Sequence, residues 1–305
     1  MATGRTLDAG GQDAAISGNL NSRRLQGVAL VLLSALVFST TGLFVKGVGA
    51  DAWVILFWRG LSATAFTLAW LHWRRALDGE FARMGKPGLA AAIVGALATA
   101  AFIPAFKYTS VANVSLIYAA VPFAAAAIAW LWIRETPTRS VLVASLAAFA
   151  GVAVIVGGSL HSLNLRGDLL ALAMTVGMAG FLCIYRRYPQ TPAAGPTVLS
   201  SLILMLPALL LSEPLAIPLG EILVIGAFGL LFAIAAVTMA EGARRLPAGE
   251  TALLSALETP LAPIWAFLLL RELPGVATLV GGLVILVAVF ASQGYAILRR
   301  GARAR

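Results

Sequence analysis

Charged residues are scarce in this sequence of 305 residues, of which only 11% are Asp, Glu, Lys or Arg and 60% are hydrophobic. A soluble globular domain has about 25% charged residues, so the composition excludes a chain whose main solvent is water. Apolar stretches recur from Leu25 to Leu298, and at about 20 residues each is long enough to cross a hydrocarbon core of about 30 Å as a helix. The sequence therefore predicts an all-α integral membrane protein.

Ligating and nucleophilic side chains are also rare. There is one cysteine, Cys183, and there are two scattered histidines, His72 and His161, so the sequence predicts neither a disulfide framework nor a metal site. An intramembrane hydrolase needs clustered metal ligands, a Ser–His pair or two aspartates at membrane depth, and the sequence shows none of these patterns. A filter loop typical of an ion channel is also missing. We expect no catalytic residue, no metal and no cofactor.

Charges, prolines and glycines divide the apolar sequence into ten predicted spans, five on each side of a break at residues 159–166. Residues 1–24 are polar and lack the apolar core of a signal peptide, so we expect a disordered cytoplasmic tail there and a short basic tail at residues 299–305. The two predicted five-helix domains are residues 25–158 and 167–298. The spans are expected at 25–47, 53–73, 87–106, 111–133 and 140–158, then at 167–185, 196–211, 221–241, 249–270 and 275–298.

The 22 Lys and Arg residues are distributed unequally between alternate loops. Because these residues resist translocation when they lie in short loops, the side with more of them is predicted to be cytoplasmic, together with both termini. The net charge of +9 is then expected to face the anionic surface of the lipid bilayer rather than a nucleic acid. Arg59 lies inside a span, and the loops of the opposite side hold only Lys46, Lys107, Arg166 and Arg271.

The two halves of the sequence resemble each other at a spacing of 137 residues. This register aligns residues 105–135 with residues 242–272 and places Arg134-Glu135 on Arg271-Glu272. Five spans in each half give the halves opposite orientations. Inverted repeats are a recurrent plan of secondary transporters, in which two similar bundles open a site near the bilayer midplane to each side in turn. The sequence therefore predicts ten transmembrane helices as two inverted five-helix repeats around a central cavity.

Five short segments carry a more specific pattern through their order and spacing: 38–46 (FSTTGLFVK), 58–60 (WRG), 107–113 (KYTSVAN), 186–187 (RR) and 257–263 (LETPLAP). Together they resemble the drug/metabolite transporter superfamily, in particular chains with two tandem EamA domains. The resemblance implies export of small metabolites, amino acids first among them, across a bacterial inner membrane. Drugs and nucleotide sugars are the alternative substrates. The family pattern has Pro directly after the Glu of the ninth span, where this chain has Thr259 and then Pro260.

Two charged residues are expected at membrane depth, Arg59 in the second span and Glu258 near the middle of the ninth. A charge at the bilayer centre costs about 2.5–3.5 kcal/mol and is usually retained where it faces a cavity or a partner. Two interpretations therefore stay open. The two residues belong to a substrate site, or they hold the bundle together by pairing with each other or with helix ends that prolines leave free.

The fourth span carries a polar face formed by Asn113, Ser115 and Tyr118 at helical spacing. These side chains are candidates for hydrogen bonds to the ammonium and carboxylate of a substrate, and the alternative is that they bond to neighbouring helices. The candidate substrate site is therefore Glu258, Asn113, Tyr118, Ser115 and Arg59. Runs of small residues at 144–158 and 275–294 are expected to pack helices within a monomer or a weak dimer.

Overall fold

The structure, a computed structural model, describes residues 9–134, 136–137, 139–158, 164–243, 245, 254–255 and 257–303. These residues form helices joined by turns, with no strand among them. The first half contains α1 (Ala9–Ser39), α2 (Thr41–Gly47), α3 (Ala52–Trp73), α4 (Leu77–Ala82), α5 (Gly85–Tyr108), α6 (Val111–Tyr118), α7 (Val121–Ile128), η1 (Ala129–Ile133) and α8 (Arg139–Gly158). The second half contains α9 (Leu165–Arg187), α10 (Ala194–Leu211), α11 (Leu219–Ala243), α13 (Glu258–Trp265), η2 (Ala266–Leu270) and α14 (Val276–Arg303).

Within the described residues, 8 helical segments are long and apolar enough to cross a membrane. They coincide with the first eight predicted spans. The ninth and tenth predicted spans contain shorter apolar helical stretches, Glu258–Leu270 and Val276–Ala291. The prediction of a multi-pass helical membrane protein is thus confirmed, and the count of ten crossings stays a prediction.

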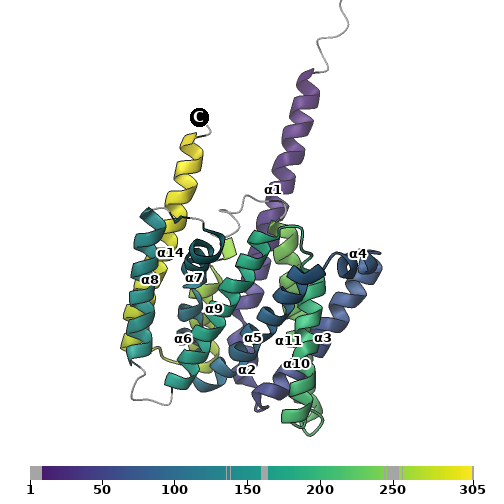
Figure 1. The fold of residues 1–305 in the computed structure, drawn as a ribbon, viewed down its shortest axis with the longest axis vertical. Helices are drawn as coiled ribbons and strands as arrows, with labels where there is room; N and C mark the ends of the chain where they lie inside the picture. Colours follow the sequence, from purple (N-terminus) through teal and green to yellow (C-terminus); the bar gives the residue numbers. More distant parts are fainter. Residues whose placement is uncertain are drawn as a thin grey trace, which may run out of the picture.

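The two terminal helices are longer than the sequence predicts. α1 begins at Ala9, where the sequence predicted a disordered tail up to residue 24, and α14 continues to Arg303 instead of ending at residue 298. No proline lies between Ala9 and Ser39, so no missing backbone donor interrupts the helix there. Figure 1 shows that α1 and α14 both project from the same end of the bundle.

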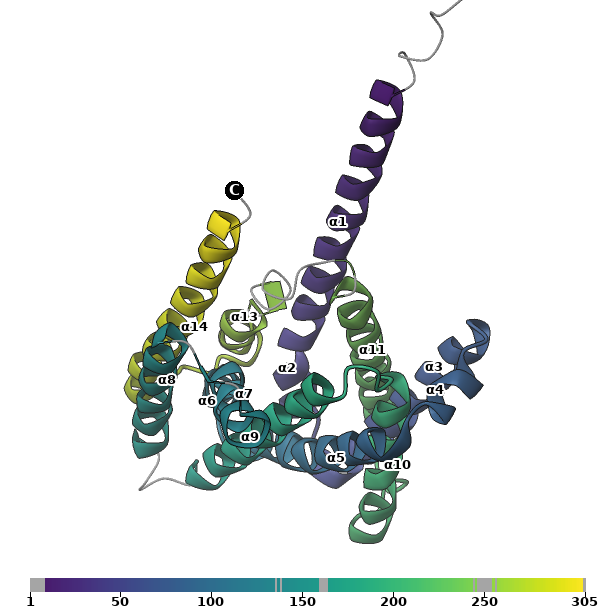
Figure 2. The ribbon, with the colours of Figure 1, turned by 45° about the horizontal axis from the view of Figure 1, so that its top comes forward.

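Helices of the first half pack mainly against helices of the second half. The most extensive contacts join α5 to α9, α8 to α14, α3 to α10 and α1 to α11. α1 and α9 are the first helices of their halves, and α5 and α11 both belong to the third predicted spans, so the α5–α9 contact is equivalent to the α1–α11 contact. Such paired contacts are expected of two similar halves that interlock. Figure 2 shows α8 and α14 side by side at one edge of this arrangement.

The contact between α8 and α14 depends on glycine. A Cβ atom built on Gly151 of α8 would lie 2.6 Å from the carbonyl oxygen of Gly281 of α14. In lipid, helices associate through such close backbone approach because the lipid tails are as apolar as the side chains. The small-residue runs at 144–158 and 275–294 therefore pack two helices of the same chain against each other at this contact, as predicted.

The fourth span of the first half and the ninth span, its counterpart in the second half, share the same succession of pieces. α7 is followed by the π-helix η1 and by Arg134 with a φ of 60°, and α13 is followed by the π-helix η2 and by Arg271 with a φ of 54°. Each boundary lies 137 residues after its counterpart, as the sequence register predicts. Pro122 and Pro260 lie in the first turns of α7 and α13, and a proline has no N–H to continue a preceding helix.

Candidate functional site

The breaks in the two helices bring Tyr118 and Glu258 together. Tyr118 is the last residue of α6, Glu258 is the first residue of α13, and these two helices are in contact. Both side chains are half-buried, and the Glu258 carboxylate interacts electrostatically with the Tyr118 phenol. Free N–H groups and the helix dipole at the start of a helix favour a negative charge such as that of Glu258.

Among the described residues, no ion pair involves Glu258. A carboxylate next to a phenol can accept hydrogen bonds from a ligand's ammonium group, or it can bind a proton. The Tyr118 hydroxyl can donate to the same ligand or accept from it. The pair therefore forms a small polar site between the two halves of the chain.

Arg59 does not neutralise Glu258. Its side chain is only 4% exposed, and the guanidinium carbon lies 4.3 Å from the ring centroid of Phe232 and 5.7 Å from that of Phe228, both on α11. Among the described residues, its Nε and Nη1 atoms have no hydrogen-bond partner. The interpretation in which Arg59 and Glu258 pair to hold the bundle together is therefore wrong, and Arg59 is a buried cation stabilised by aromatic rings.

Asn113 takes part in a buried network at the start of α6. Its Nδ2 atom donates to both carboxylate oxygens of Asp168 on α9, at 2.9 and 3.0 Å, and its Oδ1 atom accepts from the hydroxyl of Thr278 on α14. The Thr109 hydroxyl donates to Asp168 at 2.6 Å. The Asn113 amide thus joins three helices, and both its polar atoms are already occupied in this arrangement.

Ser115 is also buried, with 8% of its surface exposed. It lies on α6 between Asn113 and Tyr118, and its carbonyl oxygen accepts from the Ala119 N–H at 3.1 Å where α6 ends. Of the five predicted site residues, the structure brings together Glu258 and Tyr118. It places Asn113 in a network with Asp168, Ser115 inside the packing of α6, and Arg59 between α3 and α11.

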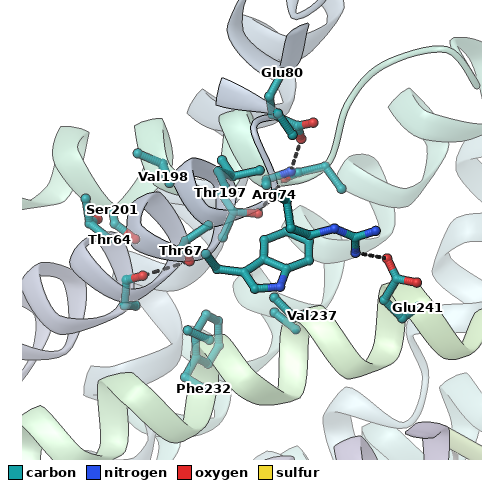
Figure 3. A pocket seen from close by; sticks show the side chains of 18 residues that line it. Thr64, Thr67, Arg74, Glu80, Thr197, Val198, Ser201, Phe232, Val237 and Glu241 are labelled. Carbon is teal, nitrogen blue, oxygen red and sulfur yellow. Dashed lines mark hydrogen bonds and ion pairs between the residues drawn. The ribbon is translucent and has the colours of Figure 1, made fainter. Parts of the chain in front are cut away.

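A cavity of about 280 Å³ lies between α3, α10 and α11 (Figure 3). Its polar lining includes the hydroxyl-bearing residues Thr64, Thr67, Thr197 and Ser201. At its edge, Arg74 and Glu241 form an ion pair of 3.3 Å, and a Glu80 carboxylate oxygen accepts from the Ala194 N–H at 2.6 Å. A second cavity, of about 420 Å³, is lined by residues of α3, α5 and α9, including Trp53, Pro104 and Arg166.

Polar contacts join the two halves at both ends of the bundle. At one end, Lys46 and Glu272 form an ion pair of 3.1 Å, and the other Glu272 oxygen accepts from the Val111 N–H at 2.8 Å. At the other end, the Arg74–Glu241 pair joins α3 to α11.

Sequence reasoning missed several of these residues. Asp168 was overlooked because it follows Arg166 directly after the break at residues 159–166, where a charge is typical of a loop. Asp168 lies in the first turn of α9, and its place as the second residue of the span predicted at 167–185 was the available signal. Thr64, Thr67, Thr197 and Ser201 gave no signal, because isolated hydroxyls are common in membrane helices and usually bond to their own backbone. In the part of the chain that the structure describes, no three His, Cys, Asp or Glu side chains gather as a metal site.

The paired broken helices and the apolar spans define a multi-pass membrane protein built from two similar repeats. The model of the EamA-like transporter family matches residues 25–157 and again residues 165–292. The chain therefore belongs to the EamA-like transporter family, and the resemblance seen in the sequence is confirmed at this level.

One solved structure, titled "Crystal structure of protein", shares this fold with a TM-score of 0.64. It is 20% identical in sequence, and the match covers 89% of this chain and 97% of that chain. This similarity in structure supports the arrangement of helices described above. A search of curated proteins finds no match.

Proposed function

We propose that this protein exports small neutral or aromatic amino acids across a bacterial inner membrane by alternating access. The observation that carries the proposal is the contact between α6 and α13, which sets Glu258 beside Tyr118 at the breaks of two equivalent helices. Transporters place substrate sites at such breaks, where helix ends leave backbone groups free. Glu258 would bind the substrate's ammonium group or a coupling proton, and Tyr118 would orient the substrate.

The proposed arrangement has ten crossings in two inverted repeats around a central cavity, with both termini in the cytoplasm and the protein acting as a monomer or weak dimer. Figure 1 supports opposite directions, because α1 runs into the bundle from the end where α14 leaves it, and α9 starts at the opposite end. Alternating access then requires the Lys46–Glu272 contact and the Arg74–Glu241 contact to open in turn.

Uptake into proteoliposomes tests the proposal with a panel of radiolabelled amino acids, sugars and cationic drugs. We expect amino acids to be transported, with the rate reduced at least about tenfold in Glu258→Gln, because a hydrogen bond to a charged group contributes about 1.5–3 kcal/mol. The matched control is Glu213→Gln, which alters an exposed acid in a loop. Transport of drugs alone, or full transport by Glu258→Gln at every pH, would contradict the proposal.

The orientation has a separate test. Single cysteines at Glu213 and Arg245, both exposed, are introduced in a Cys183→Ala background. We expect an impermeant thiol reagent added to intact cells to label the residue-213 cysteine and not the residue-245 cysteine. Equal labelling of the two positions would contradict the proposed topology.

A further inference from the structure

The walls of the cavity between α3, α10 and α11 offer hydrogen-bond acceptors. The Thr67 hydroxyl donates to the Ala63 carbonyl at 2.7 Å, and the Thr197 hydroxyl donates to the Ala193 carbonyl at 2.8 Å. A hydroxyl has one proton to donate, so the remaining lone pairs of both oxygens are acceptors. The carboxylates of Glu80 and Glu241 at the edge of the cavity add to this set (Figure 3). These groups suit a ligand that carries N–H donors, such as an ammonium group.

A buried cation, Arg59, lies outside the lining of the same cavity and stacks on the ring of Phe232, which belongs to that lining. Ala63 and Phe232 line the cavity, and Arg59 lies four residues before Ala63 on α3, which places both on one face of the helix. The guanidinium carbon lies 4.3 Å from the centroid of the Phe232 ring, and the Nε and Nη1 atoms have no partner among the residues that the structure describes. Leaving buried donors of a charged group unpaired is costly, so this position suits an anionic group of a ligand that displaces the Phe232 ring.

Thr64 is, after Arg59, the second residue near this cavity with an unpaired polar atom. Its Oγ1 atom is buried and has no hydrogen-bond partner in the part of the chain that the structure describes, and its side chain lines the cavity. Apolar side chains complete the lining, namely Trp70, Leu71, Val198, Phe232 and Val237. The volume of about 280 Å³ is slightly below the range of about 300–1,000 Å³ that is typical of sites for drug-sized molecules.

We propose that this cavity is a second substrate site, distinct from Glu258 and Tyr118, that binds a small zwitterion with an apolar side chain. The carboxylate binds Thr64 and Arg59, and the ammonium group faces the acceptor of Thr67, about one helical turn further along α3. The inference rests on the proposed function, since it places amino acids at this site before they reach Glu258. With the positive loops inside, the edge of the cavity at Arg74 opens towards the cytoplasm, where an exported substrate enters.

Equilibrium binding of tritiated L-phenylalanine to the purified chain in detergent tests the proposal. The measurements use Glu258→Gln, in which the contribution of the Glu258 site is expected to be at least about tenfold weaker. We expect this variant to bind L-phenylalanine, and we expect phenethylamine and 3-phenylpropionate, which lack the carboxylate and the ammonium group respectively, to compete at least about tenfold more weakly. Equal competition by either analogue would overturn the zwitterion assignment.

Three further substitutions in the same background locate the site. Thr64→Val keeps the shape and removes the hydroxyl, and Arg59→Lys keeps the charge and loses the planar fork of donors. Each is expected to weaken binding about tenfold, and Ala63→Leu, which fills the cavity, is expected to abolish it. The matched control is Thr175→Val, which removes a buried hydroxyl bonded to Ala171 on α9, away from the cavity. It should leave the affinity unchanged.

The outcomes separate this inference from the proposed function. If the parent transports L-phenylalanine but Glu258→Gln does not bind it, or binds it with an affinity that Thr64→Val and Ala63→Leu leave unchanged, the second site is overturned and the transport function stands. If the parent neither transports nor binds any amino acid, the proposed function fails and this inference fails with it.

Discussion

The first residue of α7 is the buried Val121, and the first residue of α13, at the equivalent position 137 residues later, is the half-buried Glu258. The two helices have the same length and lead into π-helices of the same length. Their surroundings differ, since Val121 is 5% exposed and belongs to the buried core. Near the far end of α13, Trp265 donates to the Ser39 hydroxyl at 3.0 Å, whereas Ile128 occupies the equivalent place in α7.

The two repeats thus share the course of the backbone in this region and differ in their side chains. Only the second repeat has a carboxylate at the first position of the helix. Under the proposed function, this single carboxylate binds one ammonium group in a defined orientation. The repeat that lacks the charge contributes Tyr118 and the apolar wall instead.

The largest expected effect comes from making the two helices chemically equal. Val121→Glu places an unpaired charge at a buried position, and we expect a loss of about 3–5 kcal/mol in the free energy of unfolding, as for other uncompensated buried charges. The measurement is unfolding of the purified chain in mixed micelles by titration with sodium dodecyl sulfate. Val121→Ala is the control for the loss of packing. Parent-like stability of Val121→Glu would show that the two positions are equivalent.

A somewhat smaller effect is expected at Asp168, the other carboxylate that the structure buries near α6. Its side chain is fully buried and accepts hydrogen bonds from Thr109 and Asn113. Asp168→Ala should lower the free energy of unfolding by about 2–3 kcal/mol, because it leaves these buried donors unpaired. Glu258→Ala, which removes no such partner, should change it by less than about 1 kcal/mol. Similar losses for the two variants in the same titration would erase the distinction between a structural and a functional carboxylate.

The ion pair that follows η2 should contribute less. Lys46 and Glu272 are 26% and 18% exposed, so solvent screens their interaction, and the expected coupling energy is up to about 1 kcal/mol. A double-mutant cycle with Lys46→Gln and Glu272→Gln measures it in the same unfolding assay. Glu272→Gln also keeps an acceptor for the Val111 N–H. A coupling energy of zero would show that the Lys46–Glu272 ion pair does not stabilise the fold. Any effect of Glu272 on stability would then come from its hydrogen bond with the Val111 N–H.

The smallest effect on stability is expected from the prolines that open the two helices. Pro122 and Pro260 lie in first helical turns, where a missing N–H breaks no hydrogen bond within the helix. Pro122→Ala and Pro260→Ala should each change the free energy of unfolding by less than about 1 kcal/mol. If Pro122→Ala alone destabilises strongly, the break in the first repeat depends on its proline and the break in the second does not.

Much of the fold could be predicted from the sequence, since hydropathy alone locates the spans. The pair Arg134-Glu135 and Arg271-Glu272 also gave the register at which the structure repeats. The π-helices could not be predicted, because a run of Ala, Phe, Trp and Leu residues does not distinguish a π-helical turn from an α-helical one. The helical start of α1 was missed because its composition is polar and rich in glycine.

The candidate site was predicted less completely. Glu258 was found because a carboxylate among apolar residues is conspicuous. The surroundings of Arg59 were not predictable, because its partners are Phe228 and Phe232, and phenylalanine in a membrane helix is no signal of a cation. Asn113 was predicted to lie on a polar face of its helix, and only the structure shows that this face meets Asp168.

The left-handed arginines at the ends of η1 and η2 bear on the history of the chain. A non-glycine residue with positive φ raises the free energy of the folded chain by about 1–3 kcal/mol. Arg134 and Arg271 both adopt this conformation. If the two segments had arisen independently, the same arginine, the same π-helix length of five residues and the same strained φ would all have had to appear twice. A single five-helix ancestor that already had this feature, duplicated and fused end to end, explains it. With the inverted repeats proposed above, such an ancestor would have had to insert in both orientations to form the bundle.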